Sequence, residues 1–161
     1  MKLIKLGLIS VVILFGVLTL IASFIPSQIR ISRAVDMDSP RDSILNKIKS
    51  LRTWDNWNEY TKSYENKTFT DSTIRTDAVL ITIVKTTDSS ITCEWKQPSG
   101  RKFEAVFNVI SHDFNNTTLQ WYFDFKLRWY PWEKFQAIVY DQQLGPAMEK
   151  SLQNLKSFIN Q

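Results

Sequence analysis

The residues that could do chemistry are few in this chain of 161 residues. His112 is the only histidine and Cys93 is the only cysteine. A cysteine nucleophile needs a base and a further group that orients the base, and no neighbour is placed to orient His112 toward Cys93. A metal site needs three or four converging ligands, and the scattered carboxylates supply no such pattern. We therefore predict no metal and no cofactor, with His112 in a solvated loop and Cys93 in the core.

Two acids, Glu59 and Asp124, are the best candidates for an inward or rim position. Asp124 alternates with apolar residues and so falls on the polar face of its predicted strand. General acid-base catalysis needs a group within hydrogen-bond reach of the reacting proton, and the carboxylates give no paired arrangement. A solvent-facing role is favoured for Asp124, and catalysis by Asp124 or Glu59 stays a lesser alternative.

Aromatic residues make up 13% of the chain, including six tryptophans. That much aromatic surface must be buried in a core or line a pocket. The clearest alternation puts apolar side chains on one face of a strand and mostly polar ones on the other. The apolar face carries Leu119, Trp121, Phe123, Phe125, Leu127 and Trp129. Taken singly, each of these side chains is more typical of a core than of a cavity wall.

An uncharged apolar run from Leu6 to Ile25 begins the chain. Its 20 residues would span about 30 Å as a helix, the thickness of a bilayer core. We predict an uncleaved transmembrane anchor over residues 1–26 and a folded domain over residues 27–161. The alternative is a cleaved signal peptide, but the run exceeds the usual length of such a segment and no good cleavage site follows it.

The flanking charges address the orientation of this anchor. Lys2 and Lys5 favour a cytoplasmic N-terminus, whereas Arg30 and Arg33 on the other side oppose it. Long domains cross membranes despite their charge. We expect a single-pass protein with its N-terminus inside and its domain outside the cytoplasm.

The composition of the remaining domain excludes one class of partner. Two of the 20 basic residues lie in the anchor, which leaves 18 basic against 16 acidic residues. No basic run or stripe appears, so nucleic acid is not implied. About 135 residues suit one domain with a sizeable core.

The hydrophobic periods predict an α+β domain. Residues 27–37 alternate as a strand, Ser39 and Pro40 suit the N-cap and first position of a short helix, and Ile44, Ile48 and Leu51 follow at helical spacing. Residues 67–130 read as antiparallel strands separated by turns. After Pro131 the period becomes helical, and Pro146 should kink or restart the long C-terminal helix. We expect that helix to lie across a curved antiparallel sheet.

Three segments of the chain carry short motifs in a characteristic order and spacing. The first is the opening strand followed by Ser39-Pro40-Arg41-Asp42, and the second is Trp54-x-x-Trp57. The third begins at Thr118-x-x-x-Tyr122, continues through Tyr130-Pro131-Trp132-Glu133-Lys134-Phe135 and ends in Leu144-Gly145-Pro146-x-Met148-Glu149-Lys150-x-Leu152-x-x-Leu155-Lys156. Together these segments resemble the START-like superfamily, also called the SRPBCC group, which includes polyketide cyclases. The third segment is similar to the C-terminal part of the membrane-anchored bacterial members of that superfamily. Asn58 and Glu59 stand where the family usually has a proline, and Ser151 replaces its usual glycine.

The resemblance implies a helix-grip fold with a cavity between the sheet and the C-terminal helix. It implies a membrane-tethered domain that binds an apolar small molecule or lipid. Two alternatives stay open: an interaction module with a filled core, and a cyclase- or hydrolase-like enzyme that uses Asp124 or Glu59. The residues that we predict to bind the ligand are Trp95, Phe107, Trp121, Phe123, Phe125, Phe135, Val139 and Met148.

Overall fold

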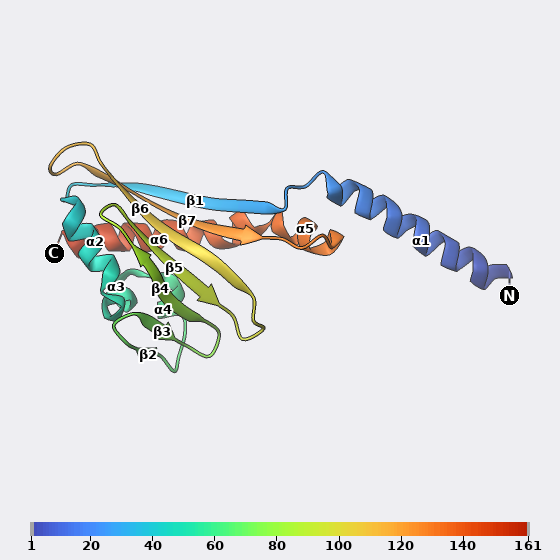
Figure 1. The fold of residues 1–161 in the computed structure, drawn as a ribbon, viewed down its shortest axis with the longest axis horizontal. Coiled ribbons are helices and arrows are strands. Elements are labelled where there is room, and N and C mark those ends of the chain that lie inside the picture. Colours follow the sequence, from blue (N-terminus) through green and yellow to red (C-terminus); the bar gives the residue numbers. More distant parts are fainter. Residues whose placement is uncertain (1, 161) are drawn as a thin grey trace.

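The N-terminal helix α1 (Lys2–Ser23) extends away from the rest of the chain in the computed structural model, which describes residues 2–160 (Figure 1). Its side chains are almost all exposed. By length and composition it can cross a membrane, a property that a signal sequence shares. Ser10, Thr19 and Ser23 donate hydrogen bonds to carbonyls one turn earlier in the helix, which satisfies their hydroxyls internally. The predicted boundary between residues 26 and 27 lies in the segment that joins α1 to the first strand.

Seven antiparallel strands form one sheet in the order β1-β7-β6-β5-β4-β3-β2. Strands β2 to β7 follow one another as a meander, and β1 pairs with β7 from Gln28 opposite Lys126 to Met37 opposite Thr117. Gly100 lies in the left-handed region, with φ of 82°, and closes the turn between β5 and β6. The strands are β1 (Gln28–Met37), β2 (Thr68–Phe69), β3 (Thr73–Arg75), β4 (Leu80–Thr86), β5 (Ser90–Lys96), β6 (Lys102–Ser111) and β7 (Thr117–Lys126).

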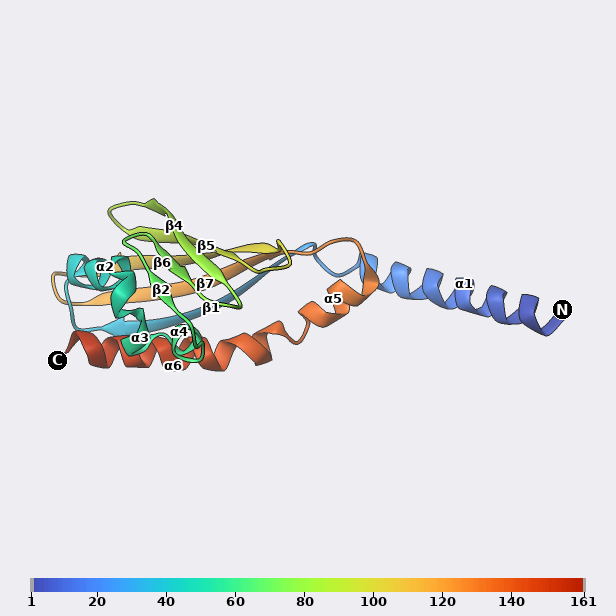
Figure 2. The same cartoon turned by 90° about the horizontal axis from the view of Figure 1, so that it is seen from below.

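The helices that follow β1 form two groups. The first group joins β1 to β2 and consists of α2 (Arg41–Lys49), a 3-10 turn η1 (Leu51–Thr53), α3 (Trp54–Trp57) and α4 (Glu59–Lys62). The second group follows β7 and consists of α5 (Pro131–Ala137) and α6 (Tyr140–Ile159). Figure 2 shows α6 running along one face of the sheet, with α5 between it and the end of α1.

The α+β class and the long C-terminal helix are therefore confirmed. The inner face of β7 is buried from Leu119 to Phe125, as is Leu127 just after the strand. Met148, Leu152 and Leu155 of α6 are buried as well. The prediction that Trp129 belongs to this apolar face is wrong, because its side chain is 62% exposed. Strand β7 ends at Lys126, so the alternation of faces no longer applies to it.

Two helix details also differ from expectation. Pro40, not Ser39, is the N-cap of α2, and the carbonyl of Ser39 instead accepts a hydrogen bond from the Thr117 hydroxyl at 2.9 Å. The break in the C-terminal helical region lies at residues 138 and 139, between α5 and α6, and α6 continues through Pro146.

Arg33 joins β1 to α6. It lies on the inner face of β1, where its guanidinium donates to Asp141 at 2.9 Å and to Glu149 at 2.6 Å. A Cβ on residue 145 would overlap this guanidinium, so Gly145 leaves room for it. The hydrogen bonds to Asp141 and then Glu149 raise the pKa of Arg33. A charged residue on the inner face is thus satisfied by carboxylates from the covering helix.

Candidate functional site: a half-open aromatic cavity

A cavity of about 350 Å³ lies between the sheet and the start of α6. It is neither sealed nor a flat surface, and its volume falls within the usual range for small-molecule sites, about 300–1,000 Å³. The β5–β6 hairpin, the inner face of β7, α4 with the segment after it, and the α5–α6 region all contribute. Its lining residues are Tyr60, Tyr64, Ala78, Val79, Trp95, Gln97, Arg101, Phe103, Phe123, Phe125, Gln136, Tyr140, Gln143 and Leu144.

Four aromatic rings form the sheet side of this cavity. The Trp95 and Phe123 rings meet edge to face at 5.3 Å between centroids, and the Phe103 and Phe125 rings lie 5.0 Å apart. Cross-strand pairing explains the arrangement, because Trp95 of β5 lies opposite Phe103 of β6. Such ring pairs add packing energy beyond their buried area, so this wall is preformed.

Tyr60 separates the cavity from a filled part of the core. Its ring makes edge contacts with Trp95, Trp121 and Phe123, with centroids 5.7, 5.8 and 6.0 Å away. Its hydroxyl donates to the carbonyl of Leu144 at 2.8 Å, which holds α4 against α6. The partition is therefore fixed by both packing and a hydrogen bond.

Beyond Tyr60 the same sheet face is solidly packed. The ring centroids of Trp54 and Trp57 lie 5.1 Å apart, and the Phe107 ring stacks on the Trp121 ring with centroids 4.9 Å apart. All four side chains are fully buried, as is Met148 from α6. The W-x-x-W segment thus serves as core filling at this end of the sheet.

The cavity lining also carries polar groups with unused hydrogen-bond capacity. Within residues 2–160, the Nε1 of Trp95 and the Nη2 of Arg101 are buried without a hydrogen-bond partner. Leaving a buried donor unsatisfied costs about 1–3 kcal/mol. Arg101 also brings a positive charge to the lining, which favours an anionic group in a ligand.

Two of the three tyrosines in the lining, Tyr60 and Tyr64, are donors and not bases. Burial raises the pKa of the Tyr60 hydroxyl well above its ordinary value, and burial also raises the pKa of Tyr64. Both phenols therefore stay protonated at neutral pH. Among the residues described, the lining contains no carboxylate and no imidazole.

Comparisons with known proteins show which solved structures share this fold. No protein-family model matches the chain, and no curated protein matches it by sequence. Solved structures do match. A START superfamily protein from Mycobacterium smegmatis superposes with a TM-score of 0.60 at 14% identity, over 81% of this chain and 97% of that chain. The Zhui aromatase/cyclase from Streptomyces sp. R1128 superposes with a TM-score of 0.59 at 10% identity, over 83% and 94%. Truncated norcoclaurine synthase from Thalictrum flavum gives 0.59 at 9% identity, over 82% and 93%.

The chain has a START-like fold. Superposition over more than four-fifths of the chain and nearly all of each matched structure covers the sheet and the helices together. At these identities the likeness establishes the fold, and activity has to be argued from the START-like domain's own cavity.

Three of the eight predicted ligand-binding residues line the cavity of this START-like domain, and five do not. Trp95, Phe123 and Phe125 line the cavity, whereas Phe107, Trp121 and Met148 lie in the filled core and are not part of the lining. Phe135 and Val139, of α5 and the junction after it, are also outside the lining, although their neighbours Gln136 and Tyr140 belong to it. Contact of any of the eight with a ligand stays a prediction.

Sequence reasoning missed most of the polar lining. Tyr60 was visible as an aromatic residue three positions after Trp57, and Phe103 as a member of the inner face of its strand. Arg101 lies in a turn, where no periodicity marks direction. Gln136 and Gln143 sit at polar positions of the C-terminal helices, which read from sequence as solvent-facing.

The candidate acids of the START-like domain are engaged in ion pairs. Asp124 accepts two hydrogen bonds of 2.7 Å from Arg30 on the outer face of the sheet, as its position in the alternation predicted. Glu59 pairs with Lys150 at 2.8 Å and with Lys62 at 3.3 Å. These lysines, Lys150 first, lower the pKa of Glu59. Neither acid lines the cavity.

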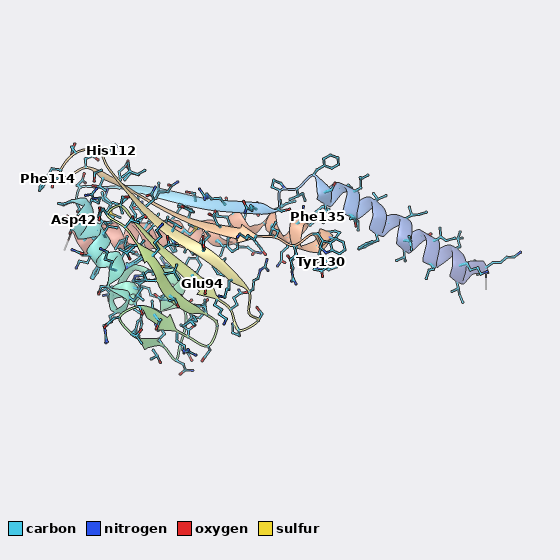
Figure 3. All side chains as sticks on the ribbon, in the orientation of Figure 1. Asp42, Glu94, His112, Phe114, Tyr130 and Phe135 are labelled. Atoms are coloured by element: carbon cyan, nitrogen blue, oxygen red, sulfur yellow. The ribbon has the colours of Figure 1, made fainter. Side chains whose placement is uncertain are left out.

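His112 and Cys93 do not form a pair. His112 is exposed beside Thr118, whose hydroxyl lies 2.9 Å from its Nε2, and Figure 3 labels it at the end of the domain far from α1. Cys93 is fully buried on β5, opposite Ala105. The expected solvated histidine and core cysteine are both confirmed. Among residues 2–160 no group of three or more His, Cys, Asp or Glu side chains is placed to hold a metal ion.

Proposed function

We propose that this protein is a membrane-tethered START-like module that binds a hydrophobic small molecule or lipid in its aromatic cavity. The observation that carries the proposal is the preformed cavity itself, with four aromatic rings on one side and the charged Arg101 in its lining. Burying apolar ligand surface contributes about 25 cal/mol per Å². A ligand with an apolar body and an acidic or acceptor head group fits this combination.

The lining supports binding more than catalysis. General acid-base chemistry needs a group that can change protonation near the operating pH. The cavity offers Tyr60 and Tyr64, whose pKa values are raised, together with glutamines and one arginine. Glu59 and Asp124 form ion pairs elsewhere. A cyclase-like enzyme would have to work by orientation and hydrogen bonding alone.

A photoreactive fatty acid tests the binding proposal. We expect a diazirine-bearing fatty acid, added to full-length protein in lipid nanodiscs, to label Trp95 and the Phe123–Phe125 segment. Ala78→Trp should lower this labelling about fivefold or more, because overfilling an occupied space costs about 1–3 kcal/mol. Ala78 is suited to the change because it lines the cavity yet is exposed, so the core is left intact. Mass spectrometry of the labelled peptides gives the readout.

Ala34→Trp is the matched control. Ala34 is also exposed but lies on β1, outside the cavity, so its substitution should leave cavity labelling unchanged. Labelling of α1 by the probe dissolved in the bilayer serves as an internal reference in both variants. If cavity labelling is missing in the unmodified protein, or is equal in the two variants, the filled interaction module is the better description.

The tether is tested separately by extraction. We propose that α1 anchors the protein with its N-terminus inside and the domain outside, supported by the apolar length of α1 and by Lys2 and Lys5 at its start. Full-length protein should stay in the membrane pellet after alkaline carbonate. A variant with Ile13→Arg and Val17→Arg should be released, since each arginine at mid-helix costs about 2.5–3.5 kcal/mol of insertion energy. Release of the unmodified, uncleaved protein by carbonate would contradict the tether.

A further inference from the structure

Large apolar side chains are exposed around α5, at the end of the domain next to α1. Trp129 is 62% exposed and Trp132 is 58% exposed, although tryptophan normally buries most of its surface. We call the following set the α5 surface: Phe24, Trp129, Trp132, Ile138 and Val139. Exposed apolar side chains that are scattered singly are normal, whereas a contiguous apolar surface usually marks an interaction site.

The α5 surface is fixed to the end of α1. Lys134 of α5 is buried, and its Nζ donates to the carbonyl of Ile25 at 2.7 Å, two residues after α1 ends. Ala22 is the one buried residue of α1, and α5 is in contact with α1. Figures 1 and 2 both show α5 at the end of the domain where α1 leaves it. Whatever surrounds the end of α1 therefore also surrounds α5.

The chemistry of the α5 surface suits a bilayer surface. The rings of Tyr130 and Trp132 stack at 4.8 Å with planes 9° apart, and Trp129 packs on Tyr130 at the same distance. Arg128 lies 5.3 Å above Tyr130 and pairs with Glu133, which places a charged group beside the rings. Tryptophan and tyrosine concentrate at membrane interfaces because one part of each ring system is apolar and another is polar.

We propose that the α5 surface lies in the head-group layer of the bilayer that holds α1. This inference rests on the tether of the proposed function. The occupant is the phospholipid surface, because the α5 surface is continuous with the transmembrane helix and cannot leave the membrane while Lys134 holds Ile25. Interfacial segments of this type bury their apolar side chains about 5–10 Å into the boundary between head groups and acyl chains.

The placement has a consequence for the cavity. Gln136 lines the cavity and lies four residues, about one helical turn, after Trp132, so both share one face of α5. Tyr140 and Gln143, at the start of α6, continue the same wall. The cavity therefore lies beside the membrane, and its ligand is an amphiphile that resides in the bilayer and enters without crossing bulk water.

Spin labels at three introduced cysteines test the proposal in full-length protein reconstituted into phosphatidylcholine vesicles. The sites are Trp132→Cys on α5, Leu14→Cys in α1 and Phe114→Cys, whose side chain is 83% exposed at the far end of the domain (Figure 3). The native chain, whose only cysteine is buried, provides the blank. Accessibility to oxygen and to a water-soluble nickel chelate gives the depth of each label. We expect depths of roughly 5–10 Å at position 132, a deep position at 14 and a fully aqueous one at 114.

Each other outcome overturns the inference in a recognisable way. A buried label at position 14 with an aqueous label at 132 leaves the tether intact and removes the α5 contact with the membrane. A label at 132 that is shielded from both reagents and broadened by a second label shows a second copy of the chain on this surface instead. An aqueous label at position 14 removes the tether, and the inference falls with it.

Discussion

Leu155→Ala is expected to lower the free energy of unfolding by about 2–5 kcal/mol. Leu155 is fully buried on α6, where that helix covers the sheet. Truncation removes the transfer energy of its methyl groups and leaves a cavity that a rigid aromatic core cannot fill. Urea unfolding of full-length protein in mild detergent, followed by tryptophan fluorescence, measures the loss.

Ile110→Ala is the control for this experiment. Ile110 is similar in size and is 43% exposed on β6, so its truncation should change stability by no more than about 0.5 kcal/mol. A loss below about 1 kcal/mol for Leu155→Ala would mean that α6 does not cover the core as described.

Cys93 is expected to be almost inert toward thiol reagents until the domain unfolds. Burial raises its pKa from 9.0 to about 12. Since the thiolate is the reacting species, that shift alone lowers the reactive fraction about a thousandfold at neutral pH. Alkylation at pH 8, followed by mass spectrometry, should be at least about a hundredfold slower in native protein than in urea. Rapid alkylation of native protein would contradict the placement of Cys93 in the core.

The same shift gives stability a pH dependence with a definite sign. The unfolded chain ionises Cys93 above pH 9, whereas the folded protein keeps the thiol neutral up to about pH 12. The contribution is complete below pH 9 and is lost as the pH rises from 9 to 12. The unfolding free energy from this group should fall by about 1.4 kcal/mol between pH 8 and pH 10. Cys93→Ala should lack this fall in unfolding free energy, because it has no thiol to ionise. Each protein is compared with itself at the two pH values, so the effect of the substitution on overall stability cancels.

The faces of the strands were predictable from sequence, because a period of two assigns side chains without any knowledge of partners. Ile91, Cys93 and Trp95 lie on one buried face as their alternation predicts. The helical period after Pro131 likewise placed Leu152 and Leu155 in the core. Trp129 shows the limit of this reasoning, since a period does not reveal where the strand that carries it ends.

The cavity was less predictable, for a reason that Phe107 and Phe123 make clear. Both lie on the inner face of the sheet, but Phe107 is covered by Trp54 and Trp57, while Phe123 lies beyond Tyr60. Where helices fill the concave face depends on how α3 and α4 dock, which local sequence does not encode. Arg101 could not have been assigned to the cavity because its direction follows from the turn at Gly100.

The four residues between α1 and β1 set how far the domain can travel. Phe24 to Ser27 span at most about 14 Å when fully extended, and the bond from Lys134 to Ile25 shortens that further. If α1 lies in a bilayer as proposed, the domain stays within this distance of that membrane. It would then meet the proposed ligand only at its own membrane, and exchange with a second membrane would require that membrane to come to it.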